Sequence, residues 1–417
     1  MTNLNWHADQ TALDAVTLLD RAPESEGIDL AAVRHYRLAR VRAQMRHHHV
    51  DALILSDPIN IRYATGARNM QVFSQRNAPS RYLLLTAYRS ILFEFTGCLH
   101  LADGLDTIDE VRPASTASFV AAGPNIAERE RHWARDMQAL IRELVGKDAT
   151  LGLERLNAGT AIALKEYGLH IVDAQQAIEL ARAVKSAEEL KCIVASLRAT
   201  ENAVAALRDT LRPGLTENAL WAVLHGAVIA QNGDYCETRL LSAGQRTNPW
   251  FQESAHHVIN ANELVALDTD VVGCHGYYSD FSRTFHSGPN EPNTSQRTLY
   301  QHAYEQVHHN MSLLKPGLTF REYADRAWTI PERYFDNRYY LSAHGCGMTG
   351  EYPYLYHRAD FSDAGYDGVI ETGMTLCVES YIGERGGAEG VKLEQQVVIT
   401  ETGYDVLSHF PFENDLL

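Results

Sequence analysis

Five carboxylates stand inside stretches that otherwise have the composition of buried strands. The segments VALDTDVVGCHGYYSDFSRTF, TLCVESYI and VKLEQQVVI contain Asp268, Asp270, Asp280, Glu379 and Glu394. Because burying an unpaired carboxylate costs several kcal/mol, a fold for this chain must bring cations to these strands. Asp268 and Asp270 are two residues apart, which places both on one face of a strand, and a turn at residues 275–276 brings Asp280 opposite them.

Two explanations fit these acids. In the first, each acid pairs with a cation such as Arg283 or Lys392, or faces solvent. In the second, the acids hold two divalent ions about 3.5–4 Å apart, which removes the repulsion between like charges. His344 in the segment YLSAHGCG supplies a single imidazole, since its glycines allow close backbone approach. An oxygen-rich shell with one imidazole suits Mn, Fe(II) or Co better than a structural Zn site.

The composition limits the class of protein. A chain of 417 residues with 45% hydrophobic and 22% charged residues is typical of a folded protein of two domains. The formal net charge of -16 argues against nucleic acid or an anionic membrane as a partner. The six cysteines include no C-x-x-C pair and the N-terminus lacks a signal-peptide pattern, so we expect a cytoplasmic protein with reduced thiols.

The first half of the chain alternates strand and helix patterns. Short apolar strands are predicted at residues 52–55, 82–85, 91–95, 151–153 and 170–172, and helices near residues 30–45 and 126–145. Ser186 and Glu189 have the spacing of a capping box at the start of a long helix. We therefore predict an α/β (α+β) fold with two domains, a small one over residues 1–183 and a second over residues 184–417.

The second predicted domain contains an internal repeat. The hexapeptide Leu211-Arg-Pro-Gly-Leu-Thr216 recurs as Leu314-Lys-Pro-Gly-Leu-Thr319, an offset of 103 residues from 211 to 314. Each copy follows a helical run, and each is followed by a pair of acid-bearing strands, residues 264–272 with 277–285 after the first copy and residues 374–382 with 390–399 after the second. Two related α/β halves that face each other would place these strands around one centre.

The acids and the histidine also carry a family resemblance. The order Asp270, Asp280, His344, Glu379 and Glu394 is similar to the Asp-Asp-His-Glu-Glu site of the pita-bread metallopeptidase family, which includes methionine aminopeptidase, Xaa-Pro aminopeptidase, prolidase and creatinase. The segment DPINIRYATG at residues 57–66 resembles the N-terminal domain of the creatinase and prolidase branch. The resemblance implies a catalytic pita-bread domain with pseudo-twofold halves and two divalent ions; among Fe, Mn, Co and Zn, iron or manganese is favoured.

Two segments depart from the peptidases of this family. SAGQRTNPWF has Trp250 where the peptidases have a histidine that contacts substrate, and HGCGMTGE has Gly350 at or near a second such histidine. Peptidase chemistry without these donors loses several kcal/mol of transition-state stabilisation. The same segments resemble the dimethylsulfoniopropionate lyase branch, in which both members of the Asp268-Thr-Asp270 pair are metal ligands. That branch has an aspartate, its proposed general base, at the position of Gly350.

The resemblance and the pocket chemistry together predict a small zwitterionic substrate. A sulfonium or quaternary ammonium group binds well to aromatic faces. In the expected β-elimination, a metal acidifies the carbon beside the substrate carboxylate, a base removes its proton, and a neutral sulfide or amine leaves. The residues expected to contact substrate are Trp250, Phe251, Tyr340, Tyr352 and Arg246, and those expected to act in catalysis are Glu351, Tyr339 and Glu379.

Other functions stay open at this point. An Xaa-Pro aminopeptidase or dipeptidase is favoured by the five metal ligands. A hydrolase of another small betaine-like or carbon-nitrogen substrate and a non-enzymatic interaction module are further alternatives. The resemblance also implies a homodimer in which the N-terminal domain borders the partner's active site, with residues 69–75 as a candidate lid.

Overall fold

The computed structural model describes residues 22–69 and 80–417. The chain divides into two compact units, Met1–Arg182 and Ala183–Leu417, one residue from the predicted domain boundary. Of the expected lid at residues 69–75, all but Asn69 lies outside the described residues. No helix in the described ranges is long and apolar enough to cross a membrane.

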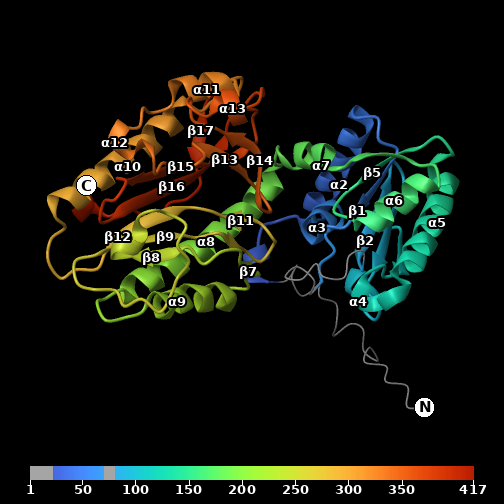
Figure 1. Ribbon diagram of the computed structural model, residues 1–417, viewed down its shortest axis with the longest axis horizontal. Helices are drawn as coiled ribbons and strands as arrows, with labels where there is room; N and C mark the ends of the chain where they lie inside the picture. The colour runs from blue at the N-terminus through green and yellow to red at the C-terminus, as the bar shows by residue number, and fades with distance from the viewer. Residues whose placement is uncertain (1–21, 70–79) are drawn as a thin grey trace, which may run out of the picture. The chain divides into compact units, whose positions relative to one another are not determined.

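The first unit is a three-layer α/β domain built on a six-stranded sheet of order β4-β3-β2-β1-β5-β6. Its strands are β1 (Ala52–Leu55), β2 (Tyr82–Thr86), β3 (Ser90–Glu94), β4 (Glu110–Pro113), β5 (Thr150–Leu153) and β6 (His170–Asp173). Its helices are α2 (Leu30–His47), α3 (Pro58–Thr65), α4 (Phe119–Ala122), α5 (Ile126–Val145), α6 (Ala158–Glu166) and α7 (Gln175–Arg182). Helices α5 and α6 cover one face of the sheet, and α2, α3 and α7 lie on the other (Figure 1).

The second unit contains two three-stranded sheets and one five-stranded sheet, with strand orders β11-β10-β7, β12-β9-β8 and β14-β13-β15-β16-β17. The first two use β7 (Tyr235–Cys236), β8 (Leu241–Ala243), β9 (Leu264–Asp268), β10 (Val271–Val272), β11 (Tyr278–Ser279) and β12 (Ser282–His286). The third uses β13 (Ala343–Cys346), β14 (Gly350–Leu355), β15 (Thr375–Gly383), β16 (Gly390–Ile399) and β17 (Tyr404–Val406). Its helices are α8 (Ala187–Thr210), α9 (Glu217–Ala230), α10 (Thr294–Leu313), α11 (Phe320–Arg326), α12 (Glu332–Phe335) and α13 (Phe361–Ala364).

The sequence signals for helix starts are confirmed. Asp29 caps α2, because its carboxylate accepts a hydrogen bond of 2.9 Å from the backbone N–H of Ala32. Helix α8 begins with the predicted capping box, in which Ser186 and Glu189 each accept a hydrogen bond from the other's backbone N–H. These reciprocal bonds satisfy backbone donors that a helix start leaves without intrahelical partners.

The hexapeptide repeat marks two equivalent structural units. The N–H of Gly214 donates to Ile259 O and the N–H of Gly317 donates to Ile370 O, both at 2.9 Å. Both glycines have a positive φ, 93° and 83°, so each copy turns in the same left-handed conformation. Each copy ends in a threonine that caps the following helix, α9 or α11. The pseudo-twofold arrangement predicted from the sequence is therefore present in the fold.

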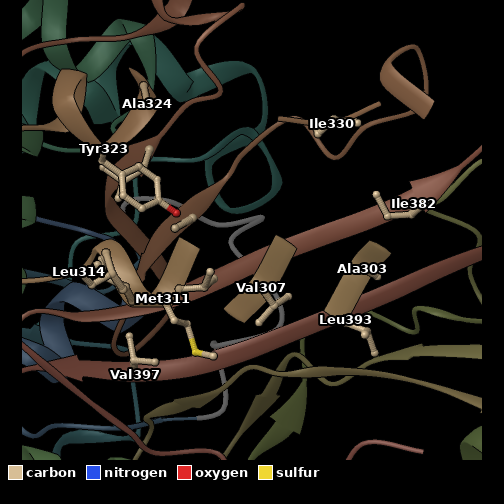
Figure 2. Packing of buried hydrophobic residues seen from close by; sticks show 14 of the residues in the cluster. Ala303, Val307, Met311, Leu314, Tyr323, Ala324, Ile330, Ile382, Leu393 and Val397 are labelled. Atoms are coloured by element: carbon tan, nitrogen blue, oxygen red, sulfur yellow. The ribbon is translucent and has the colours of Figure 1, made fainter. Parts of the chain in front are cut away.

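The apolar core of the second half lies between helix α10 and the long strands β15 and β16. Val307 and Met311 on α10 point toward strand β16, which carries Leu393 and Val397 (Figure 2). These four side chains are almost fully buried, and a buried aliphatic side chain contributes about 1.5–3 kcal/mol. This packing gives β15 and β16 the rigid support that the acids on them require.

The first acid-bearing hairpin differs from the prediction of two continuous strands. Residues 264–272 form β9 and β10 with a break between them, and residues 277–285 are likewise split into β11 and β12. Asp270 lies in the first break with φ of 42°, a left-handed conformation that ends the extended strand. The simple two-residue alternation therefore does not apply between Asp268 and Asp270.

Candidate metal centre

Strands from both halves of the second unit supply the six predicted ligands. Asp268 ends β9, Asp270 lies in the break before β10, and Asp280 lies between β11 and β12. His344 lies on β13, while Glu379 on β15 and Glu394 on β16 are directly paired across the ladder. Because β9 pairs with β12 and β15 pairs with β16, the strand register itself brings these side chains together.

Three carboxylates surround the imidazole of His344. The distances from His344 Nε2 are 3.5 Å to Asp280 Oδ2, 3.4 Å to Glu379 Oε1 and 3.6 Å to Glu394 Oε1. The opposite ring nitrogen, Nδ1, lies 2.9 Å from Gly345 O, which turns Nε2 toward the acids. Such an outer partner is the usual means by which a metal-ligating histidine is oriented.

The other acids lie within the same cluster. Ligand atoms of Asp268, Asp270 and Asp280 lie within 4.8 Å of one another, as do those of Asp280, His344, Cys377 and Glu394. Asp280 therefore belongs to both groups and would be shared by them if two ions were bound. Asp270 is held by the hydroxyl of Thr238, and Ser282 Oγ lies 2.7 Å from both Asp268 Oδ1 and Glu394 Oε2.

One lysine already occupies part of the cluster. The Lys392 ammonium is fully buried and lies 2.6 Å from Glu379 Oε2 and 3.1 Å from oxygens of Asp268 and Glu394. Pairing with Lys392 was one of the two explanations open from the sequence, and it holds for these three acids. One positive charge does not balance five carboxylates, so the lysine leaves most of the negative charge uncompensated.

The electrostatics of the acids reflect this imbalance. Burial and then the neighbouring Asp268 raise the pKa of Asp270 to about 8, and burial and then Glu394 raise the pKa of Glu379 to about 7. Burial also raises the pKa of Asp280 well above its usual range. Burial alone would raise the pKa of Glu394, but Lys392 and His344 hold it well below its usual range. These side chains share more negative charge than the protein's own cations neutralise.

The donor set fits divalent cations. Glu394 Oε1 is buried and has no hydrogen-bond partner in the described structure, although it lies beside His344. A buried carboxylate oxygen without a donor costs free energy unless a cation binds it. Five carboxylates with one imidazole match the ligand chemistry of a two-metal site of the hard to borderline divalent ions.

A cavity of about 390 Å³ opens beside this cluster. Five aromatic side chains line it together with the acids, namely Phe251, Tyr278, Tyr339, Tyr340 and Tyr354. The ring centroid of Tyr339 lies 5.3 Å from that of Phe251 and 5.0 Å from that of Tyr340. Phe251 and Tyr340 are each about half exposed, so their faces remain available to a ligand.

Four residues predicted at the site do not line this cavity. Glu351 is buried against the Lys185 ammonium and is not among the cavity-lining residues. Arg246 pairs with Glu217 at 3.0 Å, and Tyr352 packs against Phe320 and the ring of Tyr366. A fourth residue, Trp250, is buried with its ring 5.8 Å from Lys392 Nζ. Each of these side chains already has a partner within the protein.

Tyr339 does line the cavity as predicted. Burial and then the nearby Glu379 raise its pKa well above the usual range. Its hydroxyl therefore keeps its proton and can donate it to a hydrogen bond.

Two further lining residues, Glu237 and Thr238, were not among the predicted site residues. They follow the two-residue strand β7, which is too short to leave a periodic signal in the sequence.

Comparison with known proteins identifies two family domains in the chain. Residues 37–184 match the Creatinase/Prolidase N-terminal domain, and residues 191–401 match metallopeptidase family M24. The chain is 33% identical over 395 residues to dimethylsulfoniopropionate lyase DddP of Roseovarius nubinhibens, which covers 93% of this chain and 88% of that protein. It is 32% identical over 394 residues to the DddP of Roseobacter denitrificans, with the same coverage of both chains.

Solved structures of similar fold carry the names of peptidases. The Xaa-Pro dipeptidase from Bacillus anthracis superposes with a TM-score of 0.72 at 21% identity, covering 91% of this chain and 99% of that one. Dipeptidase PepE from Mycobacterium ulcerans superposes with a TM-score of 0.73 at 20% identity, covering 92% of this chain and 98% of that one. These similarities show that the two-domain fold is that of the prolidases.

Proposed function

The chain belongs to metallopeptidase family M24, and we propose that within this family it is a metal-dependent carbon-sulfur lyase. Its substrate is a small sulfonium carboxylate such as dimethylsulfoniopropionate, which it cleaves to dimethyl sulfide and acrylate. The observation that carries this proposal is the aromatic cavity beside the carboxylate cluster, in a chain about one third identical to two proteins named as such lyases.

We propose Asp268, Asp270, Asp280, His344, Glu379 and Glu394 as the residues that hold two divalent ions, with iron or manganese favoured. When bound, these ions supply Lewis acidity toward the substrate carboxylate and so favour loss of a proton from the adjacent carbon. The side chains of the protein bind the cationic group, orient the substrate and accept the proton.

Aromatic rings bind the sulfonium group in this proposal. Phe251, Tyr339 and Tyr340 line the cavity, and an aromatic face stabilises a cation by about 0.5–2 kcal/mol. The surrounding carboxylates add attraction for a positive charge. Tyr339 also keeps a proton to donate, which favours a role in orienting the substrate.

A direct assay tests the lyase proposal. Metal-loaded protein is incubated with dimethylsulfoniopropionate, and dimethyl sulfide and acrylate are measured by gas and liquid chromatography. Equal amounts of both products are expected, with none above background from the Asp280→Ala variant. Absence of both products from metal-loaded wild-type protein, across iron and manganese, contradicts the proposal.

A second candidate is an Xaa-Pro dipeptidase or aminopeptidase. It is favoured by the five family ligands and by the fold shared with the prolidases. It is opposed by Trp250, which is buried against Lys392, and by Gly350, which offers no side chain to a peptide carbonyl. Release of proline from Xaa-Pro dipeptides by the same metal-loaded protein would support it, and a parallel screen of small betaines tests the remaining carbon-nitrogen alternative.

A further inference from the structure

The proposed elimination needs a proton acceptor, and the cavity offers few. Four of its lining carboxylates, Asp268, Asp270, Asp280 and Glu379, belong to the candidate metal cluster. Gly350 also lines the cavity but has no side chain. Glu351, the next residue and the predicted base, is turned to Lys185.

Two other carboxylates line the cavity outside the metal cluster, and they differ in their partners. Glu253 forms an ion pair with the guanidinium of Arg239 at 3.0 Å. Glu237 forms no ion pair within the described part of the chain. Its side chain accepts one hydrogen bond there, from the hydroxyl of Tyr278 to Oε2. Its Oε1 atom therefore has no protein donor in the described structure and is free to accept a proton.

The position of Glu237 is fixed from two sides. Its backbone N–H donates to Asp270 O at 2.9 Å, directly after the pairing of β7 with β10. Tyr278 on β11 is buried, and its hydroxyl lies 3.3 Å from Asp270 Oδ1 as well as bonding to Glu237. The backbone and side-chain contacts together hold this carboxylate beside the metal cluster without making it a member of the cluster.

We propose that Glu237 is the base that removes the proton from the carbon adjacent to the substrate carboxylate, an inference that rests on the proposed lyase function. The carbon–hydrogen bond breaks and its proton passes to Glu237 Oε1. The electron pair forms the carbon–carbon double bond of acrylate, and the carbon–sulfur bond breaks with its electrons on sulfur. Dimethyl sulfide leaves as a neutral molecule, and Glu237 returns its proton to solvent through the open cavity.

The test compares Glu237→Gln with Glu253→Gln, a matched variant that makes the same change at the other non-cluster carboxylate. Glu237→Gln is expected to lower kcat for dimethylsulfoniopropionate at least 100-fold, with KM, metal content and melting temperature close to wild type. Glu253→Gln is expected to keep kcat within about threefold, because Glu253 lies outside the metal cluster and, in this proposal, takes no proton from the substrate. Glu237→Asp, which keeps a carboxylate, is expected to recover at least about tenfold over Glu237→Gln.

The outcomes separate this inference from the proposed function. Wild-type cleavage together with a Glu237→Gln variant that keeps kcat within about threefold overturns the role of Glu237 and leaves the lyase function standing. Loss of bound metal in Glu237→Gln also overturns the role of Glu237 as the base, because the residue would then be needed for metal binding. Absence of cleavage by wild-type protein overturns both.

Discussion

Each unit of the protein buries carboxylates, and the comparison between them shows why the cluster in the second unit is the candidate metal centre. In the first unit, Glu154 is 4% exposed and accepts hydrogen bonds from the backbone N–H groups of Ser56 and Asp57, at 3.1 and 3.0 Å, and from the amide of Asn60. Burial and then Asp57 raise its pKa to about 7. Glu154 is therefore satisfied by neutral donors and, below neutral pH, by its own proton.

The second unit concentrates five acids around one lysine and one histidine. Hydrogen bonds from Ser282 and Thr238 fix some of their oxygens but add no charge. Protonation of one acid relieves repulsion for its neighbours only in part, because the others stay close to one another. The difference between the units is thus one of charge density, and in the proposed function two divalent cations supply the missing positive charge.

The largest expected effect comes from removing the acid shared by both ligand groups. Asp280→Asn should lower the proposed lyase activity about 1,000-fold or more, because Asp280 belongs to both ligand groups and would help to hold both ions. Product formation under saturating substrate measures the loss. Glu154→Gln in the first unit is the matched control and should leave activity unchanged; equal losses in the two variants would remove the distinction between the units.

The next effect concerns the one cation that the protein supplies itself. Lys392→Met should lower the free energy of unfolding of the metal-free protein by about 3–5 kcal/mol, because it leaves Asp268, Glu379 and Glu394 unpaired in a buried site. The loss should shrink when divalent metal is added, since bound cations offset the same charge. Urea unfolding with and without chelator measures both values, and Lys392→Arg serves as the charge-preserving control. Equal losses of unfolding free energy with and without metal would contradict the claim that bound cations offset the same negative charge as Lys392.

The smallest effect is a pH dependence confined to the first unit. Glu154 has a folded pKa of about 7 against an ordinary value of 4.5, so the folded state binds its proton more tightly than the unfolded state does. The contribution of Glu154 to the free energy of unfolding is therefore fully present at low pH and is lost as the pH rises through about 7. The expected loss is about 2–3 kcal/mol between pH 5 and 8. Glu154→Gln should remove this slope.

Thiol labelling can follow the two units separately. Cys98 is buried in the first unit and Cys377 in the second, so their protection from a thiol reagent in urea reports each unit's unfolding. Comparing Glu154→Gln with wild type at each pH cancels the intrinsic pH dependence of labelling. A wild-type slope that persists in the variant at Cys98 would show that another group titrates.

The strand patterns predicted the acid cluster because charged carboxylates stand in segments whose other residues are those of buried strands. Glu379 and Glu394 stand among aliphatic residues on strands, and strand pairing places them opposite each other. The prediction of one continuous strand through Asp268 and Asp270 was wrong, because Asp270 adopts a left-handed conformation that breaks the strand. The sequence has no glycine at this position that would have indicated such a break.

Residues near the cluster were harder to assign. Trp250 and Phe251 are adjacent in sequence, yet Trp250 is buried beside Lys392 while Phe251 lines the cavity. Which of two neighbouring aromatic residues faces a cavity is decided by packing, not by residue type. Glu237 follows a strand of two residues, and its placement depends on the tertiary pairing of β7 with β10.

The metal content of the purified protein tests the central claim most directly. Elemental analysis of protein dialysed against iron or manganese should give about two divalent ions per chain, and Asp280→Asn should bind fewer while Glu154→Gln binds the same number. A wild-type chain that holds no more divalent metal than Asp280→Asn under these conditions would contradict the assignment of the acid cluster as a metal centre.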